Sequence, residues 1–278
     1  MTPEIGSDHD PRSDHRYTHG YGSSVLLGHR RRTAENSAAY LLPHLRPGMR
    51  LLDVGSGAGT ITADLARLLG PGNVTAVEVS ETAAELTRTE LQGQGIEGVE
   101  VLVADAHDLP FAEDSFDAAH AHQVLQHVAR PSEALAQMRR VVRPGGVIGA
   151  RDADYPGFRW YPDAPALDRW LELAVRAARA NGGAPDAGRR LLGWAHAAGL
   201  EDVTAGASVW CYATAEDRAW WAASWAGRIS TGPLAEQILA AGWATRPELE
   251  EMARSWTAWA EDPDGWFLVP HGEILARV

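Results

Sequence analysis

The stretch Leu51-Leu-Asp-Val-Gly-Ser-Gly-Ala-Gly-Thr60 decides the fold of this chain. Its apolar first half predicts a buried parallel strand, because such strands are covered on both faces and form nearly continuous apolar runs. Gly55, Gly57 and Gly59 then allow a sharp turn and leave no Cβ where a ligand would lie close. Residues 61–69 follow as a predicted helix whose N-terminal amides face that ligand. The stretch therefore predicts a strand, a nucleotide-binding turn and a helix.

The spacing of the glycines limits the choice of ligand. A dinucleotide fingerprint runs G-x-G-x-x-G and sets a pyrophosphate on the helix N-terminus, whereas this turn runs G-x-G-x-G and follows Asp53. A carboxylate at that position repels a pyrophosphate and suits an ammonium group. The alternative at this point is a tight turn that serves the structure alone.

Length, composition and charge bound the class of protein. The chain has 278 residues, 45% of them hydrophobic, and a formal net charge of -12. These values predict one large or two modest folded domains with a sizeable core. Arg30-Arg31-Arg32 is the one basic cluster, so nucleic acid is not an expected partner. We expect a small neutral or cationic partner molecule instead.

Cysteine use and hydropathy indicate the compartment. The single cysteine, Cys211, excludes an intramolecular disulfide and a cysteine-cluster metal site, which favours a reducing cytoplasm. We expect Cys211 to be a buried strand residue. Since the sequence contains neither a signal peptide nor the ~18 apolar residues of a membrane span, we expect a soluble cytoplasmic protein. His9, His15 and His19 are irregularly spaced in a polar terminus, which favours a solvated tail over a metal site, and no metal is predicted.

Strand and helix patterns alternate through the first half of the chain. A helix is expected from Ala34 onward, closed by Pro47-Gly48 before the first strand. The further strands are expected over 73–79, 99–104, 117–121 and 147–152, and the helices between them over 81–94 and 132–142. Such alternation with short connections predicts a doubly wound parallel sheet with helices on both faces.

The second half has a different texture and holds all eleven tryptophans. It predicts strands over 203–212 and 266–278 and helices over 168–179, 216–228, 234–241 and 247–260. The last three helices form an insertion before the final strand. Their tryptophans fit ordinary helix packing, and the alternative is an aromatic lid over a pocket. We expect a polar segment (1–33), a core (34–155) and a Trp-rich completion of the sheet (156–278) within a single overall domain.

Glu78 ends the second predicted strand, where a doubly wound fold brings a carboxylate beside the first turn. An ionised carboxylate only accepts hydrogen bonds and can bind both hydroxyls of a ribose diol. NAD-binding proteins also have an acidic residue at this strand end, so Glu78 alone does not identify the bound cofactor. A surface carboxylate without a ligand is the other interpretation.

The residues after the third strand are more specific. In Asp105-Ala106 the side chain can accept from an exocyclic amine of adenine and the next amide can donate to the ring. Followed by Asp108-Leu109-Pro110-Phe111, the pair resembles the adenine-binding segment of class I S-adenosylmethionine (SAM) dependent methyltransferases. Phe116-Asp117 and Arg143-Pro144-Gly145-Gly146, which we expect to form the turn before the fifth strand, follow in the order of that family.

The resemblance extends over residues 34–155 and is to the ubiquinone- and menaquinone-biosynthesis type of small-molecule methyltransferase. It implies a Rossmann-like, mainly parallel seven-stranded sheet whose last strand, here 266–278, is antiparallel. It also implies SAM as cofactor and an N-terminal segment that closes over it. The cofactor-binding residues it implies are Tyr21, Arg32, Asp53, Gly55, Ser56, Gly57, Gly59, Glu78, Val79, Asp105, Ala106 and Gln123.

The acceptor is expected beyond the carboxyl ends of the fourth and fifth strands, where doubly wound sheets bind ligands. His122 has a suitable ordinary pKa for a general base, with Asp152 or Asp154 orienting the acceptor. Alternatively, His120 or His122 serves only as a hydrogen-bond partner, and the two aspartates form salt bridges with Arg151 or Arg159.

Two functional hypotheses of different classes remain. The first is a SAM-dependent methyltransferase acting on a small organic acceptor through O-, N- or C-methylation, as monomer or homodimer. The second is a protein that keeps the SAM fold as a scaffold for a non-methylating reaction or for regulation. A NAD dehydrogenase is a distant third.

Overall fold

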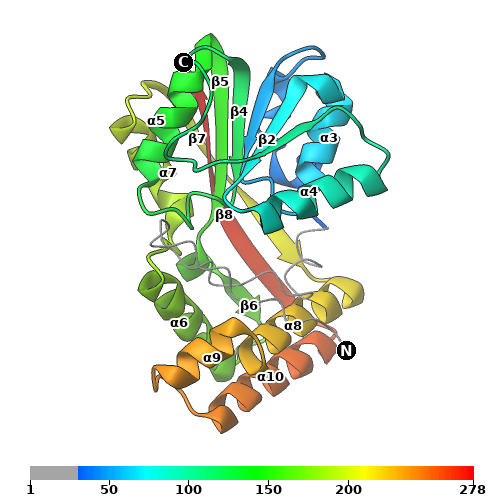
Figure 1. Cartoon of the computed structure of the whole chain (residues 1–278). Helices are drawn as coiled ribbons and strands as arrows, with labels where there is room; N and C mark the ends of the chain where they lie inside the picture. Colours follow the sequence, from blue (N-terminus) through cyan, green and yellow to red (C-terminus); the bar gives the residue numbers. More distant parts are fainter. Residues whose placement is uncertain (1–30) are drawn as a thin grey trace.

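The computed structural model describes residues 31–278, which build a central sheet of eight strands (Figure 1). The strand order is β3-β2-β1-β4-β5-β8-β6, with β7 also paired to β8. The strands are β1 (Leu51–Val54), β2 (Val74–Glu78), β3 (Glu100–Val103), β4 (Phe116–His122), β5 (Val142–Ala153), β6 (Arg159–Tyr161), β7 (Asp202–Tyr212) and β8 (Trp266–Arg277). β1 to β5 are parallel, and β8 is antiparallel to β5. The predicted fold class is confirmed, with short β6 as an additional strand.

The chain order of the strands reverses between β1 and β4. Asp53 has Ala76 of β2 as Cα partner on one side and His120 of β4 on the other. Ligands of doubly wound sheets bind at such a switch point, beyond the carboxyl ends of the strands. The glycine turn leaves β1 at this place.

Helices cover both faces of the sheet, as predicted. One face carries α2 (Ala34–Ser37), η1 (Leu42–His44), α3 (Thr60–Leu69), η2 (Pro71–Asn73) and α4 (Glu81–Gly93). The other face carries α5 (Pro131–Val141) and α7 (Ala187–Ala197), on the left of the sheet in Figure 1. Each face encloses its own apolar core, around Leu51 and Leu65 on the first and Leu52 and Leu135 on the second.

The remaining helices pack around the far half of β8, in the lower part of Figure 1. They are η3 (Tyr155–Gly157), α6 (Pro165–Ala180), α8 (Ala215–Ser230), α9 (Pro233–Ala240) and α10 (Arg246–Glu261). The insertion of α8 to α10 between β7 and β8 is confirmed. Trp225 of α8 and Trp256 of α10 are buried together with Trp170 of α6 in one apolar core. This confirms helix packing for the rings of Trp225 and Trp256. An aromatic lid over a pocket stays a prediction, as does the division of the chain into residues 1–33, 34–155 and 156–278.

Four local expectations were wrong. The helix after Ala34 is only one turn long and is followed by the separate η1, whose first turn contains Pro43. The helix α7 and the short strand β6 were not predicted from the sequence. Arg143 to Gly146 lie inside β5 rather than in a turn. Cys211 lies on β7 but is exposed, because by alternation it shares the exposed face of that strand with Val209, whereas Trp210 and Tyr212 lie on the other face.

The close approach of two glycines explains why α7 was missed. A Cβ on Gly188 would lie 2.7 Å from the Asp152 carbonyl oxygen and from the Gly272 nitrogen. The helix therefore packs with its backbone against β5 and β8. Glycine has a low helix propensity, so Gly188 weakens the helical pattern of this segment in the sequence. The reason for a glycine at this position is the tertiary contact with Gly272. Within residues 31–278, none of the helices combines the length and apolarity needed to cross a bilayer.

Candidate active site

The glycine turn has the conformation that its sequence predicts. Gly55, Gly57 and Gly59 have φ values of 72°, 59° and 81°, in the left-handed region that favours glycine. A Cβ on Gly55 would lie 2.4 Å from Cγ2 of Val124. The Gly55 amide donates to the carbonyl of Val77 at 2.8 Å, so the turn is held against β2.

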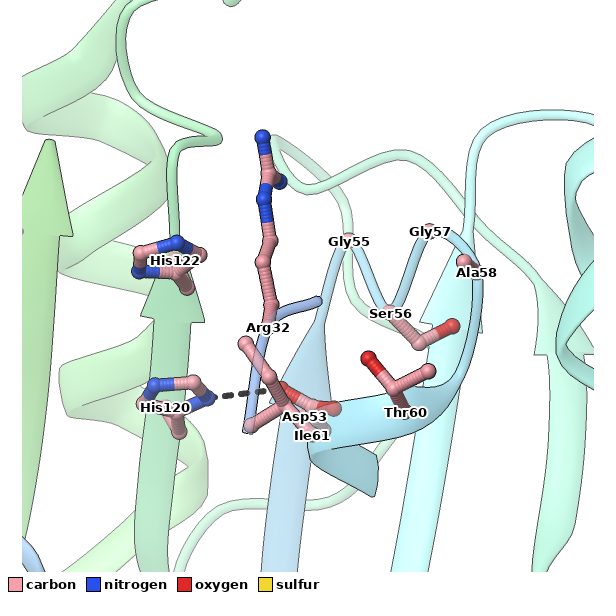
Figure 2. A pocket seen from close by; sticks show the side chains of 10 residues that line it. All are labelled: Arg32, Asp53, Gly55, Ser56, Gly57, Ala58, Thr60, Ile61, His120 and His122. Carbon is pink, nitrogen blue, oxygen red and sulfur yellow. Dashed lines mark hydrogen bonds and ion pairs between the residues drawn. The ribbon is translucent and has the colours of Figure 1, made fainter. Parts of the chain in front are cut away.

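Asp53 lies under this turn with 2% of its surface exposed. Its Oδ1 accepts a hydrogen bond from Nδ1 of His120 at 2.8 Å (Figure 2). Its Oδ2 accepts from the Thr62 hydroxyl at 2.6 Å. Because Nδ1 of His120 donates, its Nε2 is left to bind something else. That Nε2 atom is buried and has no hydrogen-bond partner among residues 31–278.

Glu78 is fixed beside the turn by two backbone amides. Its Oε1 accepts from the Gly57 N–H, and its Oε2 accepts from the Val79 N–H at 3.1 Å. Burial raises the pKa of Glu78, while these two hydrogen bonds act in the opposite direction. Each carboxylate oxygen has a second lone pair, so the group can still accept from a diol.

Asp105 lies just beyond β3 on the same carboxyl edge, outside the lining of the pocket at the turn. Its Oδ1 accepts from the backbone N–H and from Nδ1 of His107, at 2.8 and 2.7 Å. Burial raises the pKa of Asp105, but the hydrogen bonds from His107 outweigh it and lower the pKa overall. The carboxylate is therefore ionised and oriented, with Ala106 following it. Its role at an adenine stays a prediction.

A pocket opens between the glycine turn and the end of β4. It is lined by Arg32, Asp53, Gly55, Ser56, Gly57, Ala58, Thr60, Ile61, His120 and His122. Its volume is about 30 Å³, and Figure 2 shows the Arg32 side chain extending between the histidines and the turn. The Arg32 side chain therefore occupies part of the space beside the glycine turn.

Arg32 is held in this place by a relay of hydrogen bonds. Its Nη2 donates to Oε1 of Gln123 at 2.7 Å, and Nε2 of Gln123 donates to Nε2 of His271 at 2.8 Å. Nδ1 of His271 donates to the Val269 carbonyl at 3.1 Å. Gln123 has a φ of 53°, a left-handed conformation that costs energy in a residue other than glycine and is common at functional sites. Tyr21 lies outside the described residues.

His122 stands at the upper end of the pocket in Figure 2. Neither of its ring nitrogens has a hydrogen-bond partner within the described part of the chain. Burial, followed by the charges of Arg32 and Arg151, places the pKa of His122 well below its usual value. The ring is therefore neutral at pH 7 and can accept a hydrogen bond, although proton uptake there is costly.

Asp152 and Asp154 lie away from His122. Asp152 follows Arg151 on β5 and faces the other side of the sheet, where its Oδ1 accepts from the Gln126 amide at 3.1 Å. Burial raises the pKa of Asp152 to about 7, against the effect of that hydrogen bond. Asp154 pairs with Arg189 at 2.7 Å. Salt bridges with Arg151 or Arg159 were therefore the wrong alternative, and an orienting role for either aspartate stays a prediction.

β5, β7, β8 and the segment after α2 bring further residues to Arg151 and His122. Arg151 was considered in the sequence as a salt-bridge partner, whereas the others were not predicted: Tyr40, Ser208, Trp210, His271 and Glu273. Arg151 is the Cα partner of His122 on β4 and of Glu273 on β8. Alternation along β5 could have placed Arg151 on the His122 face, but the neighbours from β7 and β8 depend on the register of a distant pairing.

The residues present fit SAM. The left-handed glycines leave room for close approach, Asp53 and Glu78 offer carboxylates at adjacent strand ends, and the buried Nε2 of His120 lacks a described partner. A ligand with an amino group, a ribose diol and no phosphate matches this set of groups.

Comparisons with known proteins also indicate a methyltransferase. Residues 52–149 match the family described as methyltransferase domain. An uncharacterized methyltransferase of Schizosaccharomyces pombe is 32% identical over 269 residues, covering 94% of this chain and 96% of that protein. A ubiquinone/menaquinone biosynthesis C-methyltransferase of Ectopseudomonas mendocina is 34% identical over 118 residues, or 42% of this chain and 46% of that protein.

Among solved structures, the cyclase SpnF has the same fold, with a TM-score of 0.50 and 21% identity over 95% of this chain and 88% of that one. The fold alone therefore does not determine the reaction. The identity to a methyltransferase over nearly the whole length, together with the glycine turn and its carboxylates, does determine the family. This chain belongs to the methyltransferase family and is a SAM-dependent methyltransferase.

Proposed function

We propose that the protein transfers the methyl group of SAM to a small organic acceptor whose reacting atom lies beside His120 and His122. The observation that carries this proposal is that one pocket is lined both by the glycine turn and by these two histidines. A cofactor held at the turn and an acceptor at the end of β4 would then lie next to each other.

When bound, SAM supplies an electrophilic methyl group on a sulfonium, which leaves as the neutral thioether S-adenosylhomocysteine. The acceptor atom forms a bond to the methyl carbon while the carbon–sulfur bond breaks, and an acceptor that carries a proton must release it. The largest contribution of the protein is to hold the two reactants at near-attack distance and out of water. O-, N- and C-methylation are all compatible with these groups.

The contacts of the two histidines favour other roles than the sequence-based hypothesis, in which His122 is the general base. His120 donates from Nδ1 to the Asp53 carboxylate, so an imidazolium formed by proton uptake at Nε2 has an anionic partner. His122 instead faces the cations of Arg32 and Arg151, which oppose a second positive charge. We therefore assign proton removal to His120 and hydrogen bonding to the acceptor to His122.

The proposal is tested by measuring S-adenosylhomocysteine formation with phenolic, quinone and amine acceptors, with SAM binding followed by calorimetry. Turnover with at least one acceptor supports it. Tight SAM binding without turnover on any of them would favour the scaffold hypothesis, for which the cyclase of the same fold is a precedent. A rise in melting temperature with NAD but not with SAM would restore the dehydrogenase hypothesis.

A further inference from the structure

Arg151 has a guanidinium group that is only partly used. It is 1% exposed, and its Nε donates to the Ser208 hydroxyl at 3.0 Å and to Oε1 of Glu273 at 3.1 Å. Its Nη1 and Nη2 are buried and have no hydrogen-bond partner among the described residues. Burial lowers the pKa of Arg151 to about 10, so it remains protonated at neutral pH. Four N–H donors of a buried cation are therefore without a described acceptor.

Tyr40 adds a further donor at the same place. A Cβ on Gly149 would lie 3.1 Å from the Tyr40 hydroxyl oxygen, so this hydroxyl lies over β5 where a side chain is missing. Gly149 precedes Arg151 by two residues on the same face, and it is the Cα partner of His120. The hydroxyl is buried without a hydrogen-bond partner in residues 31–278. Burial raises the pKa of Tyr40, which keeps the hydroxyl neutral and able to donate.

The unpaired atoms form one cluster on one face of the sheet. It consists of Tyr40 Oη, His120 Nε2, both ring nitrogens of His122, and Nη1 and Nη2 of Arg151. Buried polar atoms almost always have hydrogen-bond partners, so several unpaired together call for an explanation. Most of these groups are donors, and the planar fork of an arginine matches a carboxylate in a bidentate geometry.

The charged groups around the cluster leave its N–H and O–H donors unpaired within the described residues. The carboxylates near the cluster already accept hydrogen bonds. Glu273 accepts from Arg151 and Ser208. Asp53 accepts from His120 and Thr62. His271 and His122 are neutral, because burial lowers the pKa of each. Trp210 stacks against both cations, with its ring 4.8 Å from Arg151 and 5.6 Å from Arg32. The cations Arg32 and Arg151 and the carboxylates of Asp53 and Glu273 therefore balance in formal charge, and the cluster is distinguished by N–H and O–H donors that have no described acceptor.

Arg32 lines the pocket of the glycine turn, whereas Arg151 lies beyond His122, outside the described lining of that pocket. We propose that the methyl acceptor carries a carboxylate, which the Nη1 and Nη2 atoms of Arg151 and the Tyr40 hydroxyl bind on the far side of His122. This inference rests on the proposed function and names the acceptor class within it. It differs from the expectation of a neutral or cationic partner, which rested on the net charge of -12 rather than on the donors of this cluster.

The experiment compares carboxylates with their amides. Benzoate and benzamide, and 4-hydroxybenzoate and 4-hydroxybenzamide, are titrated into the full chain by calorimetry, with and without S-adenosylhomocysteine. We expect the carboxylate of at least one pair to bind at least tenfold more tightly than the amide. We expect Arg151→Gln to abolish this preference and Arg254→Gln, at an exposed arginine of α10, to keep it. Equal binding within both pairs, or a preference that survives in Arg151→Gln, would overturn the proposal.

Tyr40→Phe keeps the test valid if Arg151→Gln does not fold. This variant removes a hydroxyl without a described partner, so a purely structural role predicts an unchanged or higher melting temperature and unchanged carboxylate affinity. We expect the melting temperature to hold and carboxylate affinity to fall at least fivefold, with Tyr161→Phe, at an exposed tyrosine, as control. Unchanged affinity in Tyr40→Phe would remove Tyr40 from the site. Failure of SAM binding alone would refute the proposed function and leave the carboxylate preference measurable.

Discussion

Nδ1 of His120 lies 2.8 Å from Oδ1 of Asp53, in the parallel pair of β4 and β1. The two residues belong to different parts of the site, since Asp53 precedes the glycine turn and His120 lies on the strand that leads to the acceptor side. Their hydrogen bond fixes the imidazole with Nε2 free. The same carboxylate thus contributes to the cofactor turn and orients a candidate base.

His120→Ala is expected to lower the rate of methyl transfer by about 100-fold or more, the usual range for loss of a positioned general base. SAM affinity should stay within about threefold, because the glycine turn is untouched. Calorimetry and S-adenosylhomocysteine formation with a proton-bearing acceptor measure the two effects, and His196→Ala, at an exposed histidine, is the control. Full turnover in His120→Ala would mean that the proton leaves by another path.

His122→Asn is expected to lower turnover about tenfold without changing the shape of the pH profile between pH 6 and 8. The pKa of His122 is depressed well below 6.5 by burial and by two nearby arginines. The ring is therefore already neutral throughout that range and contributes no inflection. A rate profile that loses an inflection near pH 6.5 in this variant would show that His122 titrates and that its depressed pKa is wrong.

Asp105→Ala is expected to weaken SAM binding about 10- to 100-fold, as for loss of a hydrogen bond to a charged group. Asp108→Ala, at an exposed neighbour in the same loop, should change the affinity less than threefold. Calorimetry at pH 7.5 measures both. Because Asp105 also orders His107, circular dichroism must show that both variants are folded. Unchanged affinity in Asp105→Ala would exclude the adenine assignment.

Asp152→Asn is expected to alter the pH dependence of stability. The pKa of Asp152 is about 7 in the folded chain against 3.8 for an unperturbed aspartate, so the folded state binds more protons between these values. Its contribution makes stability fall as pH rises from about 4 to about 7, by up to about 4 kcal/mol. The variant should lose this slope and be more stable than the parent at pH 8. Urea unfolding across pH tests this, with Asp163→Asn, at an exposed aspartate, as control.

Trp170→Ala is expected to destabilise the chain by about 3–5 kcal/mol, as for other buried aromatic side chains. The Trp170 ring is fully buried and packs edge-on against Trp225 and Trp256, with centroids 4.5 and 4.8 Å away. Trp266→Ala, at a ring that is 36% exposed, should cost less than about 1 kcal/mol. Similar urea midpoints for the two variants would contradict a core role for Trp170.

The elements that could be predicted from sequence are those with local causes. The strand before the glycine turn, the helix after it and the alternation through β5 follow from apolar periodicity and from glycine conformation. α7 could not be predicted, because Gly188 serves a backbone contact with Gly272 on a strand far along the chain. Cys211 was placed on the right strand with the wrong burial, since its exposure depends on which face of β7 is covered in the folded chain.

The sequence by itself determined the cofactor side of this protein. Asp53, the three glycines, Glu78 and Asp105-Ala106 follow one another in an order that resembles the class I methyltransferases, and that resemblance implies SAM. Only the tertiary structure decided which residues surround His122 and Arg151. Arg151, Tyr40 and Glu273 meet because β8 pairs antiparallel to β5 and the segment after α2 packs over Gly149. Contacts between residues so distant in sequence depend on strand register and burial, which no local pattern encodes.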